Sequence, residues 1–497
     1  MNIYALIQGL LQKVISLDLI DSEDEIYSRN KIMSLLSLEA FPKQVLFNSN
    51  KDIPELLEEI TDYAIKEGRI KNQSVEIEIF LSELMDIFLP RPSDLNDRFY
   101  RKFQNDPKLA TNYFYKISQN SNYIKTKDIS KNISYKVNTN YGELDITINL
   151  SKPEKDPKQI ALERKMKSET STYPNCLLCI ENEGYIGRVG HPARSNHRMI
   201  RIHVNDEKWL LQYSPYVYYN EHCILLSNTH REMKIDRETF TRLLDFIEKF
   251  PHYFIGSNAD LPIVGGSILS HDHYQGGNYE FAMAKAVNEF EFKMNDFPLI
   301  SASILKWPVS VIRLRGGNKS DLINASEYIL DKWKNYSDHE VNIVAYTGEV
   351  RHNTITPIAR IKSNNEFEID LVLRNNRTNE EHPMGIFHPH EDVHHIKKEN
   401  IGLIEVMGLA VLPARLDQEI TEIEKYLLGQ ANEIEAYHIA WAEDMKKRYV
   451  GKISTQTVSE IVRNEIGRKF LRALEDAGVY KWDEKGIKAF HRFIEIL

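Results

Sequence analysis

Residues 265–277 decide the fold prediction, and they read Gly265-Gly266-Ser267-Ile268-Leu269-Ser270-His271-Asp272-His273-Tyr274-Gln275-Gly276-Gly277. Because alternate side chains of a strand point to opposite faces, a strand here places His271, His273 and Gln275 on one face. The glycine pairs at both ends allow a backbone or a ligand to approach closely. A single histidine in a strand would indicate an ordinary core or surface side chain. Two imidazoles and a carboxamide on one face, between glycines, favour a functional site instead.

The same stretch resembles a known active-site strand. His-x-His-x-Gln after Gly-Gly-Ser is similar to the strand of the histidine-triad superfamily, and the longer run from Asn258 to Gly277 resembles the second (type 2) class of galactose-1-phosphate uridylyltransferases. The first class of that family carries His-Pro-His here, whereas this chain carries His-Asp-His. The resemblance implies an α+β fold with two histidine-triad-like antiparallel sheet halves, related by pseudo-duplication, and helical additions at both ends.

Length and composition indicate a globular protein with more than one domain. The chain has 497 residues, of which 42% are hydrophobic and 27% charged. A net charge of −9 argues against nucleic acid as a partner. The apolar start is broken by Gln8, Gln12 and Lys13 and lacks the features of a signal peptide, and no stretch approaches ~20 apolar residues. Three cysteines make no disulfide framework, so we expect a cytoplasmic protein without a membrane partner.

Apolar periodicity divides the chain into four regions: a helical N-terminal region (1–130), a first sheet half with the active-site strand (131–305), a second sheet half (306–415) and a helical C-terminal region (416–497). Helix-start signals lie at Asp52 and Pro107. The expected helices cover residues 74–89, 236–250 and 320–333. The expected strands cover residues 199–204, 252–257, 309–315 and 341–347, with hairpins over 133–150 and 358–373.

Cys176 and Cys179 form a Cys-x-x-Cys pair, which is shared by zinc sites and redox motifs. The following residues have the composition of a loop, which disfavours a redox motif, and two buried structural thiols are a further alternative. The resemblance implies a structural zinc ion bound by Cys176, Cys179, His230 and His271.

A basic stretch over residues 188–198 contains three arginines, Arg188, Arg194 and Arg198, and no carboxylate. Such a stretch is either a solvated surface loop or a clamp for a pyrophosphate, since arginine forks match phosphate oxygens. The resemblance implies further substrate contacts at Asn205 and Asp206, suited to ribose hydroxyls and base or phosphate edges. It assigns others to Asn258, Gly266 and Ser267.

The second half carries another His-x-His, at His388 and His390. In the first class of the family this half contributes a metal cluster and a glutamate-bearing helix that holds the hexose. The resemblance therefore assigns Glu405 to hexose binding. It also suggests a second metal site at His352, His388 and His390, with a carboxylate such as Glu289.

The resemblance implies that His273 attacks the α-phosphorus of UDP-glucose and that galactose 1-phosphate then accepts UMP. Histidine suits this role, because with a pKa of ~6.5 about three quarters of the ring is the neutral nucleophile at pH 7. Gln275 would donate to the phosphoryl oxygens that gain charge. A homodimer is expected by the same analogy. Two alternatives remain: a histidine-triad hydrolase or phosphorylase of nucleoside polyphosphates, and a non-catalytic, zinc-stabilised nucleotide-binding protein.

Overall fold

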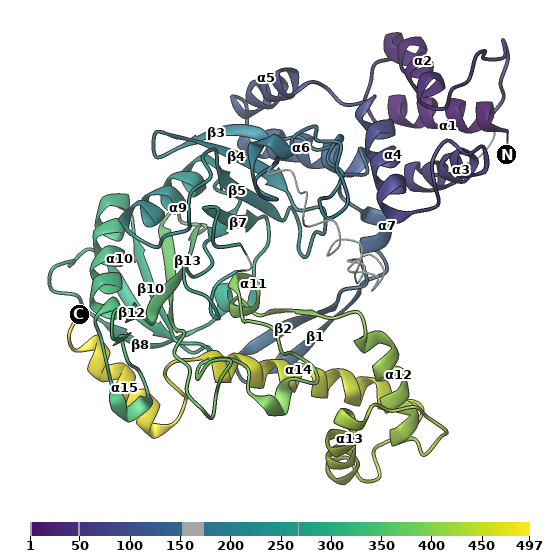
Figure 1. Ribbon diagram of the computed structural model, residues 1–497. Helices are drawn as coiled ribbons and strands as arrows, with labels where there is room; N and C mark the ends of the chain where they lie inside the picture. The colour runs from purple at the N-terminus through teal and green to yellow at the C-terminus, as the bar shows by residue number, and fades with distance from the viewer. Residues whose placement is uncertain (1, 48–49, 152–172, 267) are drawn as a thin grey trace.

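The computed structural model describes residues 2–47, 50–151, 173–266 and 268–497 (Figure 1). Its centre is one antiparallel sheet of ten strands in the order β3-β4-β5-β7-β6-β13-β14-β10-β9-β8. The strands are β3 (Ile200–Val204), β4 (Glu207–Tyr213), β5 (Cys223–Ser227), β6 (Phe254–Gly256), β7 (His273–Gly277), β8 (Asn288–Phe292), β9 (Ser301–Leu305), β10 (Val311–Gly316), β13 (Asn353–Ile361) and β14 (Phe367–Asn375).

The sheet consists of two halves with the same topology. In each half three consecutive strands are followed by a helix and two further strands, and the last strand pairs with the third. The helices are α9 (Arg237–Lys249) and α10 (Lys319–Lys334). The halves join where β6 pairs with β13, with Gly256 opposite Ile358. The predicted pseudo-duplicated α+β fold is therefore confirmed.

Strand pairing differs from the sequence prediction at three points. β8 and β9 belong to the second half, because β9 pairs with β10, so the halves do not meet at residue 305. The hairpin of β1 (Ile133–Thr139) and β2 (Gly142–Ile148) forms, but it joins β15 (Leu409–Leu412) in a separate three-stranded sheet. The strand expected at 341–347 is reduced to β11 (Tyr346–Thr347), which pairs only with β12 (Val350–Arg351).

Different elements pack against the two faces of the large sheet. α9 and α10 pack together on one face, as Figure 1 shows at the left of the molecule. α9 begins where the sequence predicts it, at an Asp236–Thr239 capping box, and buries Phe240, Leu243 and Ile247. The opposite face packs against α11 (Leu403–Val406), the three-stranded sheet and α14 (Val458–Ala477) in a second core. We refer to these as the helix face and the site face.

Helices lie at both ends of the chain, as predicted. The N-terminal helices are α1 (Ile3–Ser16), α2 (Glu25–Leu35), α3 (Ile53–Lys66), α4 (Ser74–Asp86), α5 (Pro92–Phe103), α6 (Pro107–Asn120) and α7 (Thr126–Ile129). The C-terminal helices besides α14 are α12 (Leu416–Leu427), α13 (Ala436–Arg448) and α15 (Glu484–Ile494). Phe114 of α6 packs against Tyr213 of β4 with ring centroids 5.1 Å apart, which ties the N-terminal helices to the sheet. Within the described residues, no helix has the length and apolarity needed to span a membrane.

Candidate active site

Cys176, Cys179, His230 and His271 come together as predicted. Their ligand atoms all lie within 4.8 Å of one another, with the two sulfur atoms 3.4 Å apart and Nδ1 of His230 3.2 Å from Sγ of Cys179. Nε2 of His271 donates to the carbonyl of Ser227 at 2.8 Å, which leaves Nδ1 facing the thiols. Two thiolates and two imidazole nitrogens at this separation fit a tetrahedral ion, since Zn–S and Zn–N bonds are ~2.3 and ~2.0 Å.

The catalytic candidate His273 begins β7 and is 7% exposed. Nδ1 of His273 lies 2.8 Å from the carbonyl of His271. The carbonyl can only accept, so Nδ1 carries the proton and Nε2 keeps its lone pair. Burial lowers the pKa of His273 below its usual value, which keeps the ring neutral at pH 7.

Backbone register fixes which side chains share a face with His273. Gln212, Ile224, Gln275, Gly256 and Ile358 lie opposite one another on β4, β5, β7, β6 and β13. Directly opposed residues of an antiparallel sheet project to the same side. Ile358 belongs to the core of the site face, so Gln275 and His273 lie on that face.

Side chains on the helix face hold β7 in place from the side opposite to His273. Tyr274 stacks on Trp209 with centroids 5.1 Å apart, and Asp272 accepts from Arg231 at 3.1 Å. Arg242 of α9 lies within 3.9 Å of the same carboxylate. These contacts fix the residues on either side of His273.

Gln275 has a partner that the sequence analysis did not single out. Nε2 of His222 lies 3.0 Å from Oε1 of Gln275. His222 directly precedes β5 and projects to the same face as Ile224, because the two are two positions apart. That period-two relation to an apolar strand was the only signal available in the sequence.

The loop after β6 meets α11 next to the catalytic strand. Oδ1 of Asn258 accepts from the backbone N–H of Leu403 at 2.9 Å, and a side chain at Gly266 would collide with Nδ2 of Asn258. Glu405 lies in the same turn, where it accepts from Gly402 N–H at 3.2 Å and from Lys397 at 3.0 Å. Three of the predicted substrate contacts therefore gather here. Ser267 lies outside the described residues.

The three arginines of the basic stretch differ in the residues that they contact. Arg198 is fully used inside the protein: it donates to Asp86 at 2.7 Å and to the Pro90, Ser195 and His197 carbonyls, and its side chain is 9% exposed. These contacts do not support its predicted role in a phosphate clamp.

Arg188 and Arg194 both act on His191: the backbones of Arg188 and His191 exchange two hydrogen bonds of 3.0 Å, and burial together with the charges of both arginines lowers the pKa of His191 to about 4. Arg194 also lies over the ring of Tyr123, with its guanidinium carbon 5.6 Å from the ring centroid. Tyr123 stacks on His197, whose Nε2 lies 3.0 Å from Gln212. Gln212 lies two strands away from Gln275 in the sheet, and the usual spacing of strands puts the two backbones about 9.6 Å apart.

Asn205 and Asp206 do not reach the site. Both have positive φ, 50° and 58°, and form the two-residue turn between β3 and β4, a conformation that Asn and Asp tolerate. The backbone N–H of Asn205 donates to Asp245 of α9 at 2.9 Å. The pair therefore lies beside α9 on the helix face, away from His273, and this position does not support the predicted nucleotide contacts.

The second metal site also fails to form. His352 bonds Asn376 and Thr347 at 2.9 and 2.8 Å, and His388 bonds Asn400 at 3.2 Å, so neutral partners occupy these rings. His390 lies against Asp476, while Glu289 lies on the edge strand β8 beside a different cavity. Among the residues described, only the cluster with the two cysteines gathers three or more ligands of this kind.

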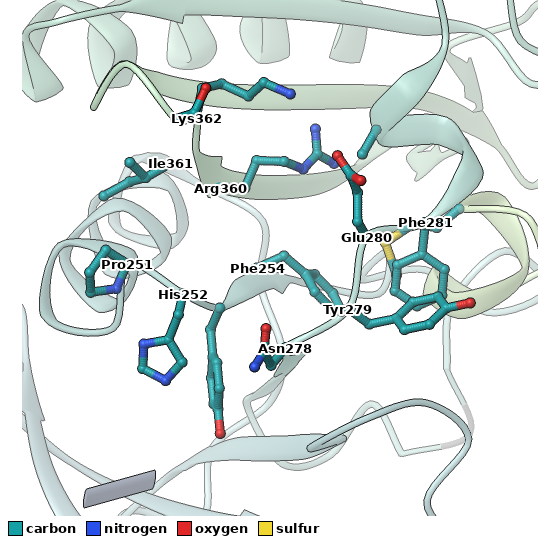
Figure 2. A pocket seen from close by; sticks show the side chains of 14 residues that line it. Pro251, His252, Phe254, Asn278, Tyr279, Glu280, Phe281, Arg360, Ile361 and Lys362 are labelled. Atoms are coloured by element: carbon teal, nitrogen blue, oxygen red, sulfur yellow. The ribbon is translucent and has the colours of Figure 1, made fainter. Parts of the chain in front are cut away.

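A cavity of about 260 Å³ lies beyond the end of β7 (Figure 2). Phe254, Asn278 and Tyr279 line it, and Arg360 reaches it from β13. Arg360 is already paired with Asp370 at 2.8 Å. None of the predicted site residues lines this cavity.

Fold and site together place a neutral histidine, with Nε2 unprotonated, beside a cluster that could hold a metal ion. Two family models match the chain: the N-terminal domain of galactose-1-phosphate uridyl transferase over residues 18–232, and the C-terminal domain over residues 246–443. The chain therefore belongs to the galactose-1-phosphate uridyl transferase family, as the resemblance implied.

Curated relatives agree over the full length. A galactose-1-phosphate uridylyltransferase of Clostridium perfringens is 52% identical over 100% of this chain and 99% of its own. One from Ligilactobacillus salivarius is 52% identical over 99% and 98%. Among solved structures, a yeast Ap4A phosphorylase covers 64% of this chain and 86% of its own at 12% identity, with a TM-score of 0.32, which is too low to support a conclusion.

Proposed function

We propose that this chain transfers UMP from UDP-glucose to galactose 1-phosphate, giving glucose 1-phosphate and UDP-galactose. Relatives of that name align with the whole chain at about half identity. The observation that carries the mechanism is the hydrogen bond between Nδ1 of His273 and the carbonyl of His271, at 2.8 Å. It leaves Nε2 as the nucleophilic nitrogen.

The reaction proceeds by two displacements at one phosphorus atom. The Nε2 lone pair of His273 forms a bond to the α-phosphorus, and the bond to the bridging oxygen breaks, so that glucose 1-phosphate leaves with the electron pair. The adduct ring is cationic, and the His271 carbonyl stabilises its Nδ1–H. A phosphate oxygen of galactose 1-phosphate then attacks the same phosphorus and expels the neutral imidazole.

Other residues bind and orient the substrates. Gln275 donates from its NH₂ group to the phosphoryl oxygens that gain charge. Arg194 and Arg188 are the proposed cations for the diphosphate, and Asn258, Gly266, Ser267 and Glu405 are proposed for the sugar phosphate.

We propose zinc as the ion of the Cys176, Cys179, His230 and His271 cluster. The ion would act structurally, fixing the Cys-x-x-Cys loop to the start of the catalytic strand. None of the three cysteines forms a disulfide, which agrees with the expected cytoplasmic location. A homodimer remains a proposal by analogy.

The partition of products tests this function against the hydrolase alternative. Purified protein with UDP-glucose and galactose 1-phosphate should give UDP-galactose as the main product, with little free UMP. Gln275→His adds a group that titrates near neutrality, so it should raise UMP release and slow transfer by ~10²–10³, the usual cost of losing one such donor. UMP as the main product of the unmodified protein would show that the chain is a hydrolase.

A further inference from the structure

His222 is a buried histidine that the reaction scheme does not yet use. It is 3% exposed, and its ring packs against Tyr219 with centroids 4.5 Å apart. Its backbone is fixed on both sides, because its N–H donates to Tyr219 at 3.1 Å and its carbonyl accepts from Ser214 at 2.9 Å. The ring therefore has one well-defined place, directly beside Gln275.

The charge state of His222 decides what it offers to Gln275. Burial lowers the pKa of His222 to about 4, so the ring is neutral at pH 7 and carries one N–H. Its Nε2 lies 3.0 Å from Oε1 of Gln275. An amide oxygen only accepts, so this contact requires the proton on Nε2.

We infer that His222 is a positioning residue: its Nε2–H holds Oε1 of Gln275 and thereby turns the Gln275 NH₂ group toward the phosphoryl oxygens. The inference rests on the proposed function. A free carboxamide can rotate and exchange donor for acceptor, and an amide oxygen facing a phosphoryl oxygen is repulsive. A neutral imidazole prevents the exchange without adding an acid to the site.

The burial of His222 is not explained by packing alone. Its Nδ1 is buried without a hydrogen bond of normal geometry to the described residues. Burying such a nitrogen costs free energy, and an apolar ring of similar size would avoid that cost. The side chain of Gln275 lies 3.0 Å from the His222 ring, and the backbone of Tyr216 lies near enough to that ring to oppose, together with Gln275, the effect of burial on its pKa.

A double-mutant cycle tests the inference. His222→Phe keeps an aromatic ring but removes the donor, and we expect kcat for UDP-galactose formation to fall ~10–100-fold, below the full loss of one donor. The KM for UDP-glucose should change little. His222→Gln carries an N–H at similar reach and should restore most of kcat. Because His222 acts through Gln275, the variant with both His222→Phe and Gln275→Ala should be no slower than Gln275→Ala alone.

The inference would be overturned if the fold loss in kcat of the double variant equalled the product of the losses in the two single variants. An unchanged kcat in His222→Phe would also overturn it. His252→Phe is the matched control, since His252 makes one side-chain hydrogen bond, to Thr111 at 2.9 Å, outside the site. It should keep its kcat.

A second measurement stands even if His222→Phe misfolds. Nitrogen-15 NMR of the unmodified protein should show His222 neutral and protonated on Nε2 at pH 7. Protonation on Nδ1 overturns the inference. If the unmodified protein makes no UDP-galactose, the proposed function fails separately.

Discussion

At the scale of single residues, backbone carbonyls give two neighbouring histidines opposite tasks. Nε2 of His271 donates to Ser227, so its Nδ1 faces the thiols. Nδ1 of His273 donates to the carbonyl of His271, so its Nε2 keeps the lone pair that the proposed attack requires. The alternation in the sequence predicted that both residues matter. It could not show which nitrogen each one presents, because that depends on carbonyls positioned by the fold.

The basic stretch over residues 188–198 also shows what the sequence could not predict. Its arginines look equivalent in the sequence but have different partners in the structure. We expect Arg194→Ala to raise the KM for UDP-glucose about tenfold or more, the scale of one charge-assisted hydrogen bond, without lowering the melting temperature. Arg198→Ala should instead lower the melting temperature, because it leaves the partly buried carbonyls of Pro90 and Ser195 without this donor, at a cost of at most ~1–3 kcal/mol. Steady-state kinetics and thermal melts check both variants. The opposite pattern would return Arg198 to the site.

At the scale of elements, local signals predicted helices well and short connections poorly. α3 begins at the predicted Asp52, within a capping box with Glu55, and α6 begins at the predicted Pro107. The Asn205–Asp206 pair looked like a ligand contact but is a hairpin turn, since a two-residue loop demands the same residue types. His222 was missed because its one local signal, a period-two relation to an apolar strand, is shared by many polar residues that have no function.

We expect the Cys-x-x-Cys segment to depend on the proposed zinc ion for its structure. Between Cys176 and β3 the chain has only one short 3₁₀ turn, Ile180–Asn182, and Nδ2 of Asn182 donates to the carbonyls of Cys176 and Cys179, both at 2.8 Å. We expect the protein to contain about one zinc per chain and Cys179→Ser to lose it and melt at a lower temperature. Metal analysis and melting curves check this. Zinc-free protein, purified without chelator, that melts like the cysteine variant would contradict it.

At the scale of the whole molecule, the N-terminal helices position the basic stretch, a role that the sequence did not indicate. Ser82 and Asp86 of α4 bond Asn196 and Arg198, at 3.3 and 2.7 Å, and Ser121 accepts from Asn196 at 3.0 Å. The helical addition thus holds the basic stretch against the sheet. These contacts join residues more than 70 positions apart, so no local pattern could reveal them.

Only the first half of the duplicated sheet carries the proposed catalytic histidine, His273. On the site face, the register that passes through Gln275 reaches Asp370 in the second half, where Arg313 and Arg360 neutralise it at 2.6 and 2.8 Å. The pseudo-duplication and the family were predictable from motifs. The absence of a second metal site on the described residues was not, because His352 and His388 differ from ligands only in their partners.

The covalent intermediate is the central claim, and labelling tests it most directly. UDP-glucose labelled on the α-phosphate should leave about one acid-labile label per chain on His273, since a histidine nucleophile forms an N–P bond. Galactose 1-phosphate should release that label as UDP-galactose. His273→Gly should take up no label and lose several orders of magnitude in rate while keeping its fold. Transfer that persists in His273→Gly, or a label on any other residue, would contradict the account.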